Sequence, residues 1–153
     1  MRSGVRVGVD VGKARIGIAR CDFHGMLATP VETVKRGDGD VARIMEIVSE
    51  LDAMEIVVGL PLSLSGGHTP STDDAEAFGR LLAAASAVPV RMVDERLSTV
   101  SAQSALRASG RTVKNSRSVI DQVAAVIIVQ HALDFERTAG NPPGVVVAPD
   151  EGL

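Results

Sequence analysis

Two spacings of apolar residues recur along the chain and predict a mixed α/β protein. The β-branched, apolar runs Val5–Asp10 and Arg15–Arg20 predict two strands, with the Gly-containing segment 11–14 as the turn between them. Leu27–Val34 can supply a third strand, in which Pro30 favours an edge position or a bulge. Together these segments predict an antiparallel three-stranded unit.

Helical and strand patterns alternate through the rest of the chain. Helical spacing of apolar residues predicts helices over 38–51, 71–85, 98–108 and 118–137, and short apolar runs predict strands at 55–59 and 88–93. Ser71-x-x-Asp74 has the pattern of a capping box at the start of the second helix. This order predicts an α/β fold with a mixed five-stranded sheet, three antiparallel strands followed by parallel additions, flanked by helices.

Length and composition indicate one domain with a tail. The chain has 153 residues, which suits a single core, and we place the domain at residues 1–137. Residues 138–153 begin with Thr-Ala-Gly-Asn-Pro-Pro-Gly and end in polar residues, so we expect this tail to be poorly ordered. The lone Cys21 excludes an internal disulfide, and no signal pattern or bilayer-spanning apolar run is present. A cytoplasmic protein without a membrane partner is expected.

The distribution of charge changes what the net charge suggests. A net charge of −3 and a pI near 5.6 argue against nucleic-acid binding when taken alone. Residues 1–36, however, contain seven basic and three acidic residues, and residues 96–120 contain five basic residues and no acid. Nine acids and one basic residue lie between Asp38 and Glu76. A polarised molecule is predicted, and with only three aromatic residues it is better suited to contacts with a duplex backbone than to base stacking.

Asp10 and the pair Asp94-Glu95 are candidate catalytic acids because each follows a predicted strand. Asp10 ends the first strand, and Gly12 and Gly17 after it allow a backbone or ligand to approach closely. The alternative for Asp10 is a turn aspartate bonded to its own backbone. Asp94 and Glu95 lie between a strand and a helix start, where the alternative is stabilisation of the helix N-terminus.

Asp121 is the third candidate. Ser118-x-x-Asp121 matches a capping box, yet Asp121 also shares a helix stripe with Ala125, Ile128 and Ala132, which should dock on the sheet. The order of elements permits the acids after the first strand, after the fifth strand and on the last helix to form one cluster. Carboxylates gathered in this way repel one another unless they hold cations, and Mg²⁺ or Mn²⁺ suits such oxygen ligands.

Four segments together resemble one known family. The chain is similar to the YqgF/RuvX family of Holliday-junction-resolvase-like proteins, also described as pre-16S rRNA nucleases, over Val5 to about Leu133. The segments are Asp10-Val-Gly-Lys-Ala-Arg-Ile-Gly-Ile-Ala19, Val58-Gly-Leu-Pro61, Asp94-Glu-Arg-Leu-Ser-Thr99, and Lys114 through Asp121-Gln-Val-Ala-Ala125.

The resemblance implies a ribonuclease H-like fold and a metal-dependent endonuclease. Asp10, Glu95 and Asp121 would bind Mg²⁺ or Mn²⁺, and the substrate would be structured RNA or branched DNA, in pre-16S rRNA processing or Holliday-junction resolution. Ala14 replaces a basic residue that often precedes Arg15 in the family. Ala124 stands where junction resolvases carry a fourth carboxylate, with Asp94 as the only evident substitute.

Basic residues around this cluster are candidate contacts for the substrate's phosphates. They are Lys13, Arg15, Arg96, Arg107, Arg111, Lys114 and Arg117. The lone loop histidine His68 is left outside the catalytic set. The sequence leaves open whether the substrate is RNA or DNA, whether one or two ions bind, and whether the protein is a monomer or a homodimer.

Two other function classes compete with the nuclease. One is a non-catalytic nucleic-acid-binding or ribosome-assembly factor with the same fold, against which the three intact carboxylates argue. The other is an ATP-binding domain, because Asp-x-Gly followed by Gly17 is also found in the phosphate-binding hairpin of actin-like ATPases, although those proteins are roughly twice this length.

Overall fold

A hairpin at the N-terminus starts the sheet, as the alternating pattern predicts. The computed structural model describes residues 1–63, 65–94 and 117–148, and of residues 117–120 the backbone alone. Strand β1 pairs with β2, and β2 with β3, all antiparallel, with a register shift between Ile18 and Ala19 opposite Pro30. The bounds are Arg6–Val11 for β1, Arg15–Cys21 for β2 and Ala28–Lys35 for β3.

Two parallel strands extend the sheet, and a sixth strand closes its far edge. Strands β4 (Glu55–Leu60) and β5 (Val90–Asp94) run parallel to β1, and β6 (Val145–Val146) is antiparallel to β5. The sheet order is β3-β2-β1-β4-β5-β6. The sequence predicted five strands, and the sixth lies in the segment expected to be a poorly ordered tail. The Gly- and Pro-rich composition of this segment offers no strand pattern from which β6 could be predicted.

Specific backbone contacts order the tail as far as residue 148. Val147 donates a backbone hydrogen bond to Val90, and Arg91 donates to the carbonyl of Pro143. Gly144 adopts φ +76° and lies so close to the chain that a Cβ there would stand 2.0 Å from the carbonyl oxygen of Met92. Only glycine fits this approach, so the residue that suggested disorder permits the strand pairing.

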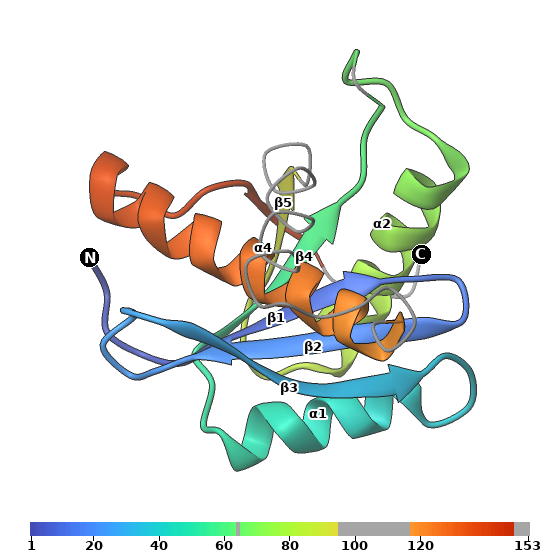
Figure 1. Cartoon of the computed structure of the whole chain (residues 1–153), viewed down its shortest axis with the longest axis horizontal. Coiled ribbons are helices and arrows are strands. Elements are labelled where there is room, and N and C mark those ends of the chain that lie inside the picture. Colours follow the sequence, from blue (N-terminus) through green and yellow to red (C-terminus); the bar gives the residue numbers. More distant parts are fainter. Residues whose placement is uncertain (64, 95–116, 149–153) are drawn as a thin grey trace.

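In the described part of the chain, helices α1, α2 and α4 cover the two faces of the sheet (Figure 1). Their bounds are Asp40–Glu50 for α1, Pro70–Ala85 for α2 and Arg117–Ala139 for α4. Helix α2 begins one residue before the predicted start. A capping box forms this end: Thr69 Oγ1 accepts a hydrogen bond from the N–H of Thr72, and Thr72 Oγ1 accepts one from the N–H of Thr69. The predicted helix 98–108 lies outside the described residues. No helix in the described part of the chain is long and apolar enough to span a bilayer.

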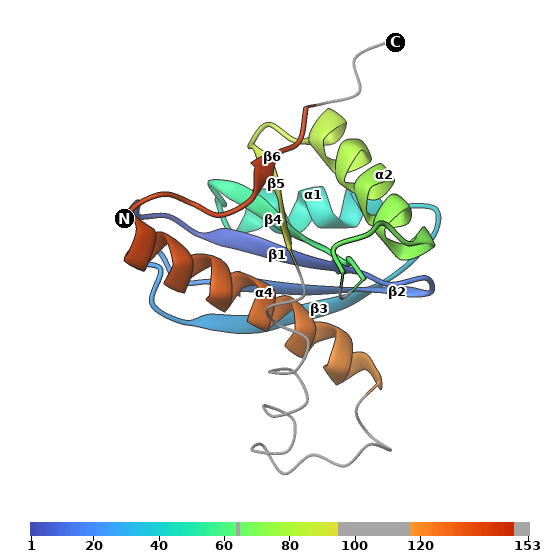
Figure 2. The same cartoon turned by 90° about the horizontal axis from the view of Figure 1, so that it is seen from above.

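Alternation along the strands divides the core between the two faces. Val9, Ile18 and Val58 belong to the cluster that α1 and α2 cover with residues such as Ile44 and Phe78. On the other face α4 packs with the stripe predicted from sequence, since Ala125, Ile128 and Ala132 are all buried. Figure 2 shows α4 on one side of the sheet and α1 and α2 on the other.

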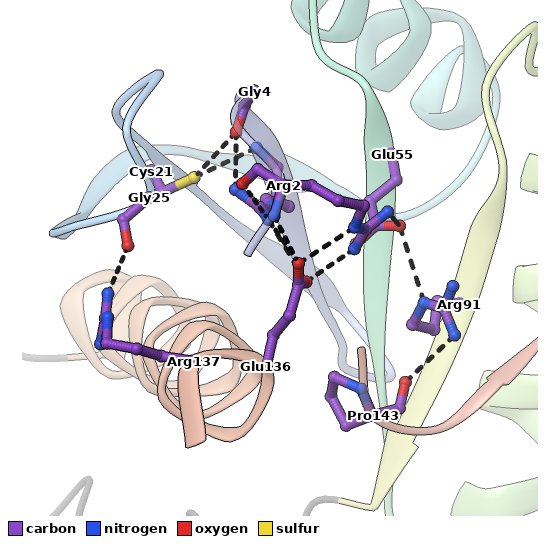
Figure 3. A network of polar contacts seen from close by, with 10 residues as sticks. Arg2, Gly4, Cys21, Gly25, Glu55, Arg91, Glu136, Arg137 and Pro143 are labelled. Atoms are coloured by element: carbon purple, nitrogen blue, oxygen red, sulfur yellow. Dashed lines mark hydrogen bonds and ion pairs between the residues drawn. The ribbon is translucent and has the colours of Figure 1, made fainter. Parts of the chain in front are cut away.

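A largely buried ionic network joins the N-terminal segment to β4 and α4 where β1 and β4 begin (Figure 3). Arg2 Nη2 lies 2.7 Å from Glu136 Oε1 on α4 and 3.0 Å from Glu55 Oε1 on β4. Arg6, 1% exposed, lies 3.3 Å from the same Glu136 oxygen. Hydrogen bonds from Arg2 lower the pKa of Glu136 from 4.5 to about 2. The network therefore fastens α4 to the sheet at the end far from the β1–β2 turn.

Removing the charge of Glu136 is expected to destabilise the fold. Glu136→Gln should lower the free energy of unfolding by about 2 kcal/mol at pH 7, because Arg6 and Arg2 lose charge-assisted hydrogen bonds in a buried place. Because the folded-state pKa is depressed, the contribution is complete above about pH 4.5 and is lost as the pH falls towards 2. Urea unfolding between pH 2.5 and 7 measures both effects.

The matched control is Glu46→Gln on α1, whose side chain is 64% exposed and whose ion pair with Arg43 is long, at 3.8 Å. It should change stability by less than about 0.5 kcal/mol. A Glu136→Gln protein with native stability and a native acid profile would contradict the role given to this network.

Candidate active site

Asp10 is placed on the α4 face of the sheet by its register. It lies near the end of β1, directly opposite Gly17 of β2, and is half-buried. Directly opposed residues of an antiparallel pair point to the same face, with Cβ positions about 5 Å apart. Val9 and Ile18 point into the core under α1 and α2. Their neighbours Asp10 and Gly17 therefore point to the other face, towards α4.

Gly17 lets α4 approach the sheet at Asp121. A Cβ built on Gly17 would lie 1.9 Å from the carbonyl oxygen of Asp121 and 3.0 Å from its Cβ. No larger residue fits there without moving the helix. Asp10 is the cross-strand neighbour of this glycine, so the register and the close approach of α4 bring residues Asp10 and Asp121 to the same face of the sheet, on either side of Gly17.

Hydrogen bonding fixes α4 in this register. Gln122 Nε2 donates to Thr33 Oγ1 at 2.9 Å, and Thr33 is the partner of Gly17 on β3. One turn further along, α4 rests on Gly8, where a Cβ would stand 3.0 Å from the carbonyl oxygen of Ala125. Sequence reasoning missed Gln122 and Thr33. The signal that could have indicated a helix packed closely on this face of the sheet was the pair of glycines at positions 8 and 17, on the same face as Asp10.

The position of Asp121 in the helix excludes a capping role for this residue. Helix α4 already includes Arg117 and Ser118, so Ser118 is inside the helix and is not its N-cap. Asp121 therefore does not serve the capping box that the spacing suggested. Its Oδ2 instead accepts a hydrogen bond from Arg15 Nε at 3.0 Å.

Arg15 reaches Asp121 because it follows the same alternation. It stands two residues before Gly17 on β2, so it faces α4 as Gly17 and Ala19 do. Its side chain is 40% exposed, and that of Asp121 is 20% exposed. The Arg15 guanidinium therefore forms an ion pair with the Asp121 carboxylate at this face of the sheet.

Asp94 and Glu95 follow β5 at the same edge of the sheet. Asp94 pairs with Leu60, so β1, β4 and β5 bring their carboxyl ends to one edge. Met92 belongs to the α1 and α2 core, and alternation gives Asp94 the face of Met92, opposite to that of Asp10. The register therefore disfavours Asp94 as a substitute ligand. Glu95, the next position, lies outside the described residues.

Two of the predicted phosphate contacts, Lys13 and Arg15, lie on different sides of the β1–β2 turn. Lys13 lines a cleft of about 550 Å³ between the turn, the start of α1 and α2, together with Arg36 and Asp74. Two hydrogen bonds from Arg36 hold the pKa of Asp74 below its usual value. The other predicted contacts, Arg96, Arg107, Arg111 and Lys114, lie outside the described residues, as does the side chain of Arg117.

His68 lies at the start of α2, away from the carboxylates of the α4 face. Its Nδ1 is 3.4 Å from Glu76 Oε1 and 3.7 Å from Asp73 Oδ1. His68 and Asp73 are exposed and Glu76 is partly exposed, and among the described residues no unpaired buried polar atom accompanies them. The group is accounted for as a surface ion-pair cluster among the described residues.

Comparison with known proteins decides the family. A family model described as "RuvX: Holliday junction resolvase" matches residues 4–135. The chain belongs to the RuvX family. It is accordingly a nuclease of that family with a ribonuclease H-like fold, as the four sequence segments indicated.

Curated relatives extend over nearly the whole chain. Proteins named "Putative pre-16S rRNA nuclease" are 65% identical in Clavibacter michiganensis subsp. michiganensis, covering 96% of this chain and 93% of the relative, and 61% identical in Leifsonia xyli subsp. xyli, covering 99% of both. Among solved structures, Thermus thermophilus RuvC bound to a Holliday junction substrate superposes with a TM-score of 0.58 at 16% identity, covering 93% of this chain and 99% of that chain. This last likeness concerns the fold.

Proposed function

We propose that this RuvX-family protein is a metal-dependent endonuclease that hydrolyses phosphodiester bonds of pre-16S rRNA during ribosome biogenesis. The observation that supports it most directly is the juxtaposition of Asp10 and Asp121 across Gly17 on the α4 face of the sheet. Glu95, which follows the last residue of β5, is proposed as the third ligand. A cytoplasmic location, expected from the lone cysteine, fits this substrate.

The donors fit Mg²⁺ or Mn²⁺. Both ions take carboxylate oxygens and keep open positions for water and phosphate oxygens. The partly exposed Asp121 carboxylate, which already accepts a hydrogen bond from the Arg15 guanidinium, supports a cation at this oxygen. When bound, the ion would lower the pKa of a water molecule and stabilise the leaving oxygen.

The protein's own residues supply the positioning. Gln122, bonded to Thr33, holds Asp121 over the row that contains Asp10. Lys13, Arg15 and the basic residues of segment 96–117 are proposed to hold the phosphates of the substrate. Ala124, one turn after Asp121, adds no carboxylate, which favours a single ion over a two-ion clamp.

A second candidate substrate is the four-way DNA junction. It is favoured by the description of the family model and by the RuvC-like fold. A junction is two-fold symmetric, so a resolvase would be expected to act as a homodimer, whereas a monomer suffices to trim an rRNA precursor. Sedimentation of the free and junction-bound protein separates the two.

Cleavage assays test the proposal directly. Labelled pre-16S rRNA fragments and synthetic four-way junctions are incubated with Mg²⁺, Mn²⁺ or EDTA. We expect cutting of the rRNA precursor with either metal, cutting abolished by EDTA, and weaker cutting of the junction, because the bound ion is proposed to activate the attacking water. Preferential cutting of junctions would assign the second substrate. Binding without cutting of either would leave the non-catalytic assembly factor.

A further inference from the structure

The ion pair between Arg15 and Asp121 joins a proposed phosphate contact to a proposed metal ligand. Arg15 Nε donates to Asp121 Oδ2 at 3.0 Å. Asp121 is proposed to hold a divalent cation, and Arg15 a phosphate of the nucleic acid. While the pair is formed, the guanidinium stands on an oxygen that the metal requires. Metal binding at Asp121 and the ion pair therefore compete.

The surroundings of Arg15 let its side chain leave without disturbing the strand. Its backbone carbonyl is fixed by the N–H of Gly12 across the β1–β2 turn. The side chain itself is 40% exposed, and Nε makes the bond to Asp121. Partly exposed ion pairs contribute little stability. A divalent cation that gathers several carboxylate oxygens should displace such an arginine readily.

Charge makes the displacement useful. Asp10, Glu95, Asp121 and Arg15 together carry −2, which repels a phosphate. Adding a divalent cation brings this sum to zero and releases a guanidinium, whose planar donors match phosphate oxygens. Arg15 begins β2, two residues before the Gly17 that lies against Asp121, so a released Arg15 stays at the same surface.

We propose that Arg15 occupies Asp121 in the metal-free protein, is displaced when a divalent cation binds, and then contacts a backbone phosphate of the substrate. This inference rests on the proposed metal site. It makes nucleic-acid affinity depend on metal loading, so that the substrate is gripped beside the reacting bond only when hydrolysis can follow. Lys13, on the other side of the turn in the α2 cleft, contributes independently of the metal.

Anisotropy titrations of a fluorescein-labelled RNA hairpin and a labelled DNA four-way junction test this coupling. They are run in EDTA and in Ca²⁺, which also takes carboxylate ligands, with a gel to show that the probe stays intact. Arg15→Gln should weaken binding about 5- to 10-fold in Ca²⁺ and less than about twofold in EDTA, because the phosphate contact exists only after displacement. Lys13→Gln, the matched control, should weaken binding by the same factor in both.

Freeing Arg15 without metal gives an independent test. In EDTA, Asp121→Asn should bind the same probes more tightly than the native protein, because no carboxylate holds the guanidinium. The gain should vanish in the double variant Asp121→Asn with Arg15→Gln. A gain that persists in the double variant, or an Arg15→Gln effect that is equal in Ca²⁺ and EDTA or absent from both, would overturn the inference.

Calorimetric titration with Mn²⁺ separates this failure from failure of the proposed function. The native protein should bind Mn²⁺, Arg15→Gln should bind it about threefold more tightly because a competing cation is gone, and Asp121→Asn should lose binding. If the native protein does not bind Mn²⁺, the metal site itself is wrong and this inference falls with it. If Mn²⁺ binds but Arg15→Gln leaves its affinity unchanged, only the displacement of Arg15 is wrong.

Discussion

Replacing Asp10 with asparagine is expected to slow metal-dependent cleavage by at least about 10³-fold, equivalent to about 4 kcal/mol of transition-state stabilisation. The amide keeps the shape of the side chain but removes the charge that would hold the ion beside Asp121. Asp10 is half-buried at the end of β1, opposite a glycine, so the substitution adds no bulk to the packed region. Single-turnover cleavage in saturating Mg²⁺ measures the loss, and thermal unfolding checks the fold.

Four other acids complete this prediction. Asp121→Asn and Glu95→Gln should lose activity to a similar extent, whereas Asp134→Asn, a 55% exposed aspartate on the same helix as Asp121, should cut within about twofold of the native rate. Native activity in both Asp10→Asn and Asp121→Asn would refute the proposed metal site. Loss in Asp94→Asn with retention in Glu95→Gln would move the third ligand to Asp94, against the register of β5.

Gly17→Ala is expected to affect stability and activity together. Its Cβ would stand 1.9 Å from the carbonyl oxygen of Asp121, a backbone atom that cannot turn aside, so α4 must move away from β2. We expect a loss of about 3 kcal/mol in the free energy of unfolding. We also expect cleavage to fall by roughly 10²-fold or more, because a displacement of 1 Å in a catalytic group has a cost of this size. Urea unfolding and cleavage assays at 20 °C measure the two effects.

Gly67→Ala is the matched control for this substitution. Gly67 lies in the loop before α2, where the nearest atom to a new Cβ is the Ser63 hydroxyl at 3.2 Å, a group that can rotate away. It should be close to native in both measurements. If Gly17→Ala were equally harmless, the close approach of α4 at this point would not be what brings Asp121 to Asp10.

Much of the candidate site followed from local pattern. Asp10 at a strand end and Asp121 on an apolar helix stripe were predicted from periodicity, and the stripe residues Ala125 and Ile128 are buried as expected. The partner of Arg15 could not be predicted, because it lies 106 positions away on another element. A basic residue beside a turn is equally typical of a phosphate contact and of an ion pair, so the sequence does not distinguish the two for Arg15.

The sequence by itself determined the family, the order of strands β1 to β5 and of helices α1, α2 and α4, and which acids are candidates, because side-chain alternation and helical spacing are local properties of the chain. The tertiary structure decided the rest. It placed Asp10 beside Asp121 through the pairing with Gly17, gave Asp94 the opposite face, and added β6 from a segment without a strand pattern. These outcomes depend on register and on close backbone approach, which arise only when segments distant in the sequence pack against one another.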